Sequence, residues 1–279
     1  MAPATRSRNV QQSPDMCCRI AVASSLLLVA GLAVAEIATP LGVKTCADDQ
    51  PNVVECRRKA LQDAVPHLAT GIPQMGAAPI DPLDELPPLT WQTNSRGMAL
   101  KFRLDNARFT GLGRSVVDNL QVDNVNNRIR VVTHIDGVNA LEGAYAMSGK
   151  VLGVPLDGSG SFKVSMRGGN ADVTYAGHLE TADGDQSYLK VDSVSVKLDL
   201  GQSQYELTGL FGDFKPLVHA GNMFINSVAT KVVQPELLPT LEKWLAEVYR
   251  QRAQAVFSTV PYDQLFPKRS VYSDSFSAV

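Results

Sequence analysis

The feature that most constrains the fold is a change in the spacing of apolar residues, from every second position to every third or fourth. Between about Met98 and Gly212 apolar and polar residues alternate, as in Phe162–Met166 and Val194–Leu200. Strands with one apolar and one polar face are typical of an antiparallel sheet that is covered on one side. From Lys215 to about Phe257 the apolar residues recur at helical spacing. These patterns predict an α+β protein in which one long helix follows the sheet.

This helix, of about 40 residues, is the only substantial cover that the sequence offers for the sheet. Since a single helix cannot hide a broad flat sheet, the antiparallel sheet is expected to curve strongly around it. Such an arrangement readily leaves an apolar cavity, which is the usual form of a ligand site. The alternative is a fully packed core without a cavity. Pro235 and Pro239 are expected to kink the helix without dividing it.

The sequence also predicts where the strands of the sheet turn and where one of them has a bulge. Hairpin turns are expected at Asp157-Gly158, at Gly168–Asn170 and at Asp183–Asp185. The apolar positions change from odd to even numbers after Val191, which predicts a β-bulge near Asp192-Ser193.

The region before the sheet contains a helix and a proline-rich segment. Apolar residues of Val53–Leu68 fall on one helical stripe, and Pro66 is expected to kink or end this helix. Residues Gly71–Pro88 carry five prolines, too many for a helix or a central strand. Because this segment is also apolar, we expect an ordered crossover packed against the rest of the domain.

The first 35 residues are predicted to be a signal peptide. Arginines precede an apolar run, Ile20–Ala35, which ends in a small-x-small cleavage site, so the mature chain would begin at Glu36. The alternatives are an uncleaved anchor and a start at Met16. The mature domain is expected to span residues 36–267, followed by a disordered tail at 268–279.

Cysteine usage agrees with a secreted protein. Cys17 and Cys18 lie in the leader, so Cys46 and Cys56 are the two cysteines of the mature chain. In an oxidising compartment such a pair is expected to form a disulfide. Two free thiols are the alternative.

Catalytic and metal-binding motifs are missing from the sequence. The four histidines are scattered, and there is no zinc motif, nucleophile elbow or phosphate loop. The formal net charge is −2 and no basic stripe occurs, which argues against nucleic acid. We therefore expect no catalytic residues, metal or cofactor, with esterase activity on a bound ester as a weak alternative.

Two blocks carry a family likeness. The first is Gly71–Gly76 followed by Pro79–Leu83, and the second is Val260–Pro267, both downstream of the cysteine pair around the first helix. Together they resemble the takeout/juvenile-hormone-binding family of arthropod secreted proteins, within the wider superfamily of tubular lipid-binding proteins. The likeness spans Cys46 to Pro267.

The resemblance implies a strongly curved antiparallel sheet wrapped around one long C-terminal helix, enclosing an apolar tunnel. It implies a secreted carrier, expected to be monomeric, for a juvenile-hormone-like terpenoid, a fatty acid or a similar lipophile, in circadian, feeding or chemosensory physiology. The alternatives are a signalling or interaction protein with a vestigial cavity and a receptor-binding surface, and lipid transfer at a membrane. No stable membrane insertion is expected.

Tyrosines are the candidate polar groups of the tunnel. Tyr145, flanked by alanines and glycines on a strand, is the first candidate for orienting the ligand, and Tyr175 is the second. The alternative for Tyr145 is a hydroxyl that bonds a backbone carbonyl or faces water. The expected apolar neighbours, each of which could equally be plain core, are Phe102, Phe162, Met166, Phe224, Val228 and Trp244.

Overall fold

The computed structural model describes residues 44–84, 86–95, 97–182, 185–210 and 215–268. The chain forms two compact units, residues 1–36 and 37–279, and all described residues belong to the second. The predicted signal peptide lies outside the described residues, as does all of the predicted tail except Lys268.

The N-terminal part of the unit is helix α1 (Val53–Thr70) followed by the proline-rich crossover. Of the two outcomes expected at Pro66, a kink or an end, the helix does not end there but runs on to Thr70. Gly71 follows with a φ of 86°, which favours glycine and stops the helix. The crossover contains the 3₁₀ turn η1 (Pro73–Met75). A second 3₁₀ turn, η2 (Leu112–Arg114), lies further along the chain, directly before residue 115. As predicted, most apolar residues of the crossover are buried, Leu83 with 1% of its surface exposed, while Ile80 is partly buried.

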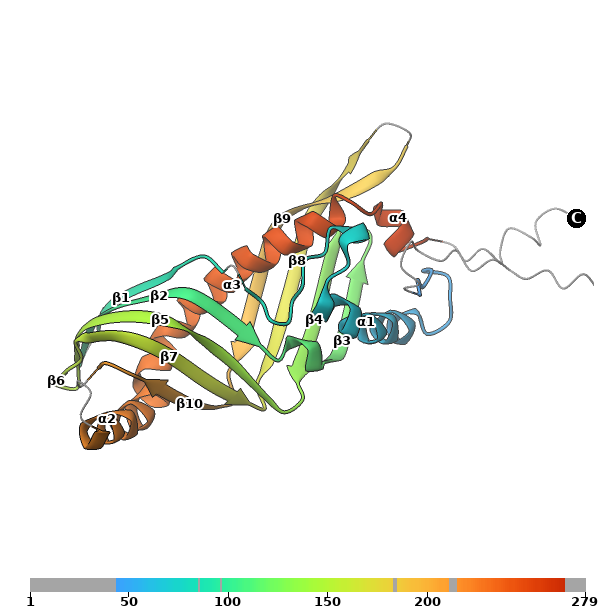
Figure 1. Cartoon of the computed structure of the whole chain (residues 1–279). Coiled ribbons are helices and arrows are strands. Elements are labelled where there is room, and N and C mark those ends of the chain that lie inside the picture. Colours follow the sequence, from blue (N-terminus) through green and yellow to red (C-terminus); the bar gives the residue numbers. More distant parts are fainter. Residues whose placement is uncertain (1–43, 85, 96, 183–184, 211–214, 269–279) are drawn as a thin grey trace, which may run out of the picture. The chain divides into compact units, whose positions relative to one another are not determined.

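The strands form two antiparallel sheets in place of the single sheet expected (Figure 1). The six-stranded sheet contains β1 (Leu89–Ser95), β2 (Met98–Thr110), β5 (Val138–Val151), β6 (Val154–Pro155), β7 (Gly158–Arg167) and β10 (Gln202–Leu207). The four-stranded sheet contains β3 (Ser115–Asp123), β4 (Arg128–Ile135), β8 (Asn170–Thr181) and β9 (Ser187–Asp199). The predicted α+β class, with antiparallel strands curved around a C-terminal helix, is confirmed.

The strand register confirms the predicted bulge. On β9 the pairing with β8 passes from Val191 to Ser193, so Asp192 is the extra residue. The β8–β9 hairpin is also confirmed, although residues 183 and 184 of its turn are outside the described residues.

Two turn predictions were wrong. Gly168 and Gly169 do not close a hairpin, because β7 pairs with β5 and β10 whereas β8 pairs with β4 and β9. These glycines carry the chain from one sheet to the other. The chain that leaves β5 reverses at Leu152-Gly153, both at positive φ, and not at Asp157-Gly158.

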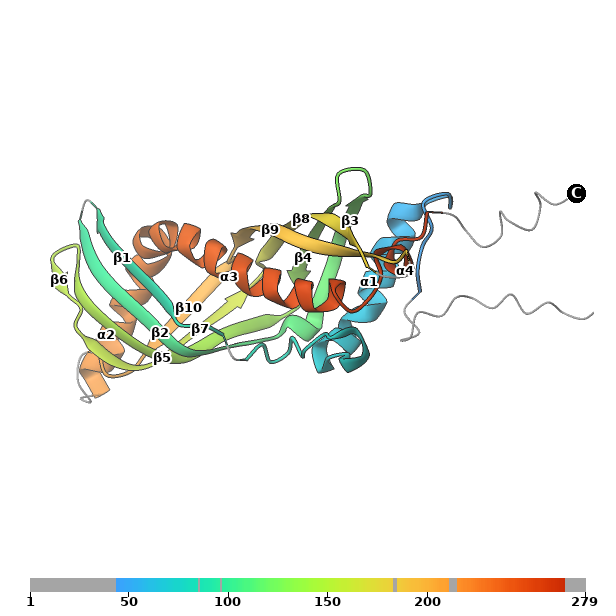
Figure 2. The ribbon, with the colours of Figure 1, turned by 90° about the horizontal axis from the view of Figure 1, so that it is seen from above.

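The C-terminal helix is continuous, as expected, from α2 (Lys215–Val228) through the π-helical segment η3 (Ala229–Val233) to α3 (Gln234–Phe257). The π turn ends two residues before Pro235, whose nitrogen has no N–H to donate and whose ring crowds the preceding turn. Figure 2 shows α3 running along the inner faces of both sheets. The short helix α4 (Tyr262–Leu265) then ends the described fold, with Tyr262 only 2% exposed.

Helix side chains form hydrogen bonds with the edge strand β10. Asn226 accepts the backbone N–H of Tyr205 at 2.8 Å and donates to its carbonyl at 2.7 Å. One helical turn earlier, Asn222 makes the same two contacts with Leu207 at 2.9 and 3.3 Å. An uncovered edge strand presents backbone groups that can pair with another chain. The two asparagines therefore close this edge of the six-stranded sheet.

Both edges of the four-stranded sheet are covered in the same manner. On β3 the N–H of Val117 donates to the side chain of Gln62 in α1 at 2.7 Å. On β9 the N–H of Leu198 donates to Glu242 of α3 at 3.1 Å, and Gln254 accepts a second N–H of this strand. The helices thus supply hydrogen-bond partners that a further strand would supply in a closed barrel.

Candidate functional site

A cavity of about 140 Å³ lies between the inner face of the six-stranded sheet, the C-terminal helix, and the ends of β4, β8 and β9. One enclosed water needs roughly 10–15 Å³ by the same measure, so this space is about ten times larger than a single-water site. Most of the surrounding side chains are apolar. They include Leu104, Phe109, Leu141, Val164, Leu198, Leu200, Val233, Leu237, Leu238, Leu241 and Leu245.

Of the residues predicted to bind a ligand, Phe102, Phe162, Met166 and Trp244 line this cavity. The rings of Phe102 and Phe162 pack edge to face with their centroids 5.8 Å apart. Trp244 donates from its indole nitrogen to the carbonyl of Pro87 at 2.9 Å, which fixes the ring between α3 and the segment before β1. The strand alternation and the helical spacing placed these four side chains on the inner surface.

Tyr145, Tyr175, Phe224 and Val228 are not among the residues that line the cavity. Val228 and Phe224 pack in the hydrophobic core of the six-stranded sheet. The hydroxyl of Tyr145 donates to the carbonyl of Thr208 at 2.8 Å, which is the alternative that the sequence left open. Burial raises the pKa of this phenol to about 12.

Sequence reasoning missed several polar residues of the cavity. Tyr205 of β10 and Gln234 of α3 both line it, and the tyrosine hydroxyl donates to the glutamine carbonyl oxygen at 3.1 Å. Tyr249 of α3 lines it as well. The spacing of apolar residues in the sequence places Tyr205 on the same side of its strand as Leu207, and Tyr249 on the same side of its helix as Leu245. This spacing was the signal that could have identified both tyrosines.

The cavity carries little charge. No lysine or arginine is among the described residues that line it; Asp199 and His134 are its ionisable groups besides tyrosines. His134 contacts Asp118 through Nδ1 at 2.9 Å, and Asp199 accepts the N–H of Gly201 at 2.8 Å. The site is therefore suited to an apolar molecule, and its described lining offers no lysine or arginine as a partner to an anion.

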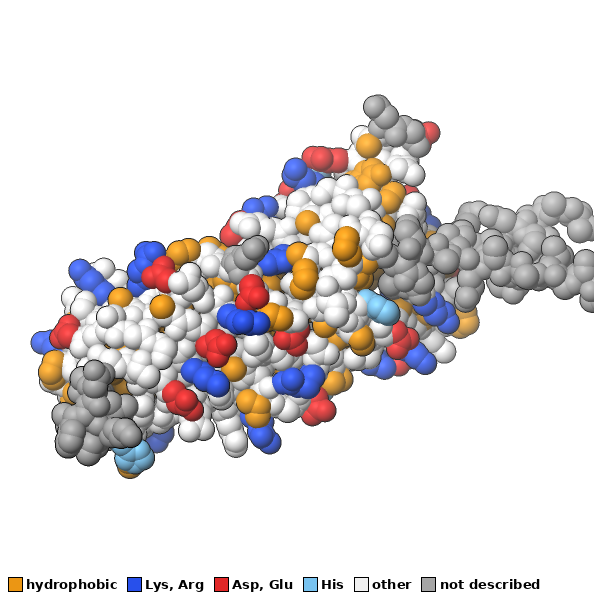
Figure 3. Space-filling view, viewed as in Figure 1, with side chains coloured by type: hydrophobic (Ala, Val, Ile, Leu, Met, Phe, Trp, Pro, Cys, Tyr) orange, Lys and Arg blue, Asp and Glu red, His pale blue; other side chains and the backbone are white. Residues whose placement is uncertain are grey.

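The outer surface differs from the cavity in that it carries many charged side chains. On the face shown in Figure 3, lysine and arginine are interspersed with aspartate and glutamate. A second hollow, of about 460 Å³, lies on β1, β2 and β5 and is lined by outward-facing residues that include Lys101 and Arg103. Its larger volume reflects its contact with solvent, so we assign the candidate site to the smaller interior cavity.

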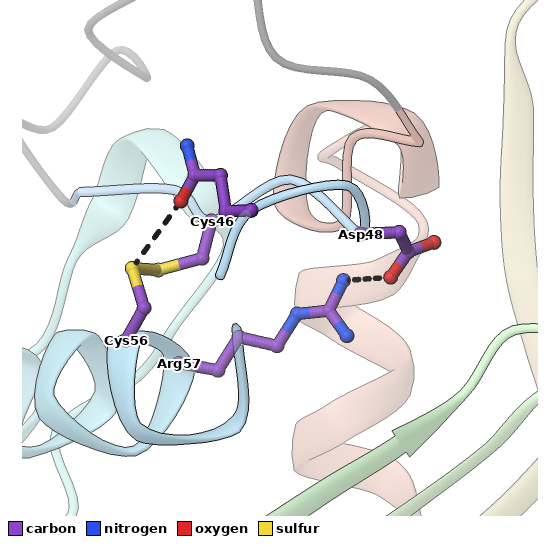
Figure 4. Close-up of a disulfide and its surroundings, with 5 residues drawn as sticks. Cys46, Asp48, Cys56 and Arg57 are labelled. Atoms are coloured by element: carbon purple, nitrogen blue, oxygen red, sulfur yellow. Dashed lines mark hydrogen bonds and ion pairs between the residues drawn. A yellow bond between two sulfur atoms is a disulfide. The ribbon is translucent and has the colours of Figure 1, made fainter. Parts of the chain in front are cut away.

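The disulfide lies at the N-terminal end of the described chain (Figure 4). Cys46 and Cys56 are bonded, as predicted, with their Cα atoms 6.0 Å apart. Beside them the guanidinium of Arg57, 7% exposed, forms an ion pair with Asp48 and lies 5.6 Å from the ring centroid of Phe266. The bridge and this ion pair hold the N-terminal arm against α1 and the last described residues.

Among the described residues, no helix is long and apolar enough to span a membrane, and no group of His, Cys, Asp or Glu is arranged to hold a metal ion.

Comparisons with known proteins agree with this architecture. The family model of the haemolymph juvenile hormone binding protein matches residues 25–267. A Schistocerca gregaria protein, provisionally named a β-carotene-binding protein, is 37% identical over 229 residues, which cover 82% of this chain and 90% of the relative. The crystal structure of Epiphyas postvittana Takeout 1 superposes with a TM-score of 0.68 at 23% identity, covering 80% of this chain and 99% of that one.

Proposed function

Because the chain belongs to the haemolymph juvenile hormone binding protein family, we propose that it carries a small hydrophobic molecule in the cavity beside α3. The observation that supports this most directly is the lining, which is aromatic and aliphatic and contains no lysine or arginine among its described residues. Terpenoids and long-chain lipids match this chemistry. The Schistocerca gregaria relative is named for a long apolar hydrocarbon of the same chemical class.

The expected affinity follows from the apolar area that a ligand would bury. A ligand that buries on the order of 400 Å² gains about 10 kcal/mol as an upper bound. Lost translational freedom and ordering of side chains remove several kcal/mol of this gain. The remaining free energy corresponds to dissociation constants from about micromolar to tens of nanomolar.

The carrier acts outside the cell in this proposal, as a monomer and without chemical conversion of the ligand. The sequence of residues 1–35 supports export, and the Cys46–Cys56 disulfide is of the kind that persists in oxidising compartments. Sequencing of the protein recovered from culture medium is expected to begin near Glu36. Recovery of the intact leader in the membrane fraction would contradict export.

Uptake of the fluorescent lipophile N-phenyl-1-naphthylamine tests the site. Ala171 of β8 lines the cavity, whereas Ala144 of β5 is exposed to solvent on the outer side of the other sheet. Ala171→Trp would fill the space and is expected to lower probe affinity at least about tenfold, or about 1.4 kcal/mol. Ala144→Trp adds the same side chain outside and is expected to leave affinity unchanged.

Circular dichroism must show the native spectrum for both variants. Denaturing extraction and mass spectrometry of the native protein are expected to recover a stoichiometric, chemically unaltered lipid. If no lipid is recovered and the wild type takes up no lipophile saturably, the carrier function is wrong and a surface-binding signalling function replaces it.

A further inference from the structure

One of the four strands that end the two sheets has an uncovered edge. The edges of β10, β3 and β9 receive hydrogen bonds from side chains of α2, α1 and α3. The remaining strand, β1, lies at the border of the six-stranded sheet (Figure 2). No side chain of the described residues bonds to its backbone, and α3 contributes one side-chain contact, between Glu236 and Thr93 at 3.5 Å. The backbone groups on the outer edge of β1 are therefore open to a partner.

The sequence of β1 contains none of the features that protect an edge strand. Natural edges are guarded by charged side chains, prolines, bulges or very short strands. β1 is seven residues long and has neither a charged residue nor a proline. Its register with β2 runs without interruption from Leu89 to Ser95, so no bulge bends the edge away. An extended segment of another chain can therefore pair with β1 along its whole length.

The charges beside this edge indicate the chemistry of such a segment. On the outer face, Lys101 of β2 is paired in register with Gln92, and both line the hollow of about 460 Å³. The neighbouring Arg103 forms an ion pair with Asp105, whereas Lys101 has no ion-pair partner among the described residues. On the inner side, where α3 lies, the exposed Glu236 also has none in this part of the chain. An added strand would thus meet an unpaired cation on one face and an unpaired anion on the other.

The outer cation can reach an added strand across β1. Neighbouring strands lie about 4.8 Å apart, so the added strand would lie about 10 Å from β2. Lys101 and a glutamate on the added strand can span this distance together, because long side chains on the same face lean over the short side chain between them. Successive side chains of a strand point to opposite faces. The complementary segment therefore has acidic residues at alternate positions and basic residues between them.

We propose that β1 binds an extended segment of a partner protein as an added strand, with acidic side chains on the outer face and basic side chains toward Glu236. This surface is separate from the cavity, so the proposal goes beyond the carrier function. A second copy of this chain fits the edge less well. Pairing of β1 with itself would place the uncharged Thr90, Gln92 and Asn94 beside Lys101 and would leave both charges without a partner.

Fluorescence anisotropy with a labelled synthetic peptide tests the proposal on the full-length secreted protein. The probe is an extended peptide in which glutamate alternates with lysine and valine, and its dissociation constant is expected to be about 10–300 μM. Methylation of the backbone nitrogens at every second residue blocks the donors along one edge of the peptide. Of the two peptides methylated in alternate sets, one is expected to lose binding and the other to keep it, because only one edge can pair with β1.

Charge variants assign the binding to this edge. Lys101→Glu is expected to weaken the probe about threefold to fivefold, and to strengthen by a similar factor a peptide with lysine in place of the glutamates. Lys190→Glu makes the same change of charge at an exposed position on β9 of the other sheet and is expected to leave both affinities unchanged. Uptake of N-phenyl-1-naphthylamine is expected to be the same in all three proteins, so a failure of this proposal leaves the carrier function in place.

The remaining outcomes overturn the proposal in different ways. Loss of binding by both methylated peptides, or by neither, shows that the probe does not bind as a strand. Equal effects of Lys101→Glu and Lys190→Glu show that it does not bind at β1. Dimers of the protein in sedimentation experiments that the peptide dissociates show that a second copy occupies the edge. The absence of saturable binding up to about 1 mM peptide means that the edge takes no such partner.

Discussion

The six-stranded sheet and the four-stranded sheet differ in the hydrogen bonds of their interior tyrosine hydroxyls. On the six-stranded sheet, Tyr145 and Tyr205 donate to Thr208 and Gln234 at 2.8 and 3.1 Å. On the four-stranded sheet, the hydroxyl of the partly buried Tyr175 of β8 has no hydrogen-bond partner among the described residues. The paired hydroxyls support stability, because a buried donor without a partner costs free energy.

The largest effect on this comparison is expected from Asn226→Ala, which removes the side chain that pairs with both backbone groups of Tyr205. The cost is about 3 kcal/mol, because buried backbone groups lose their partners. Urea unfolding measures the change. Ser227→Ala is the control, since this exposed hydroxyl bonds only within the helix, to Phe224. An equal loss in both variants would show that α2 contributes packing alone.

The next effect concerns the disulfide between Cys46 and Cys56. Replacing Cys46 and Cys56 together by alanine opens a loop of sequence separation 10 and is expected to cost about 2–3 kcal/mol in the free energy of unfolding. Uptake of N-phenyl-1-naphthylamine is expected to persist at temperatures where the variant is folded. A variant that is folded but loses this uptake would show that the N-terminal arm shapes the site.

The paired and unpaired hydroxyls are expected to differ in their smaller contributions to stability. Tyr145→Phe leaves the Thr208 carbonyl without its donor and is expected to cost about 1 kcal/mol. Tyr175→Phe removes a hydroxyl without a partner and is expected to leave the free energy of unfolding within about 0.5 kcal/mol of wild type.

Thermal or urea unfolding of the ligand-free protein checks both values. Similar losses in the free energy of unfolding for the two substitutions would mean that an ordered water pairs with the Tyr175 hydroxyl, and the contrast between the two sheets would disappear. A gain in stability for Tyr175→Phe would strengthen this contrast.

Part of the site followed from periodicity. Alternation along β2 and β7 placed Phe102, Phe162 and Met166 on the inner face, and helical spacing placed Trp244 there. Val228 also lies on the inner side of its helix, yet it packs in the core beyond the cavity. Spacing fixes the side of an element that a residue occupies. It does not fix the depth at which the packed space ends and the cavity begins.

The sequence by itself determined the strands, the continuous helix, the bulge at Asp192 and the disulfide, because each depends on local spacing or on the number of cysteines. Tertiary structure decided which strands share a sheet, so Gly168 and Gly169 cross between sheets where a hairpin was expected. It also decided that Tyr145 is occupied, because its acceptor at Thr208 is a backbone carbonyl 63 residues away. Every residue carries such a carbonyl, so no side-chain pattern can identify the one that folding brings within reach of the hydroxyl.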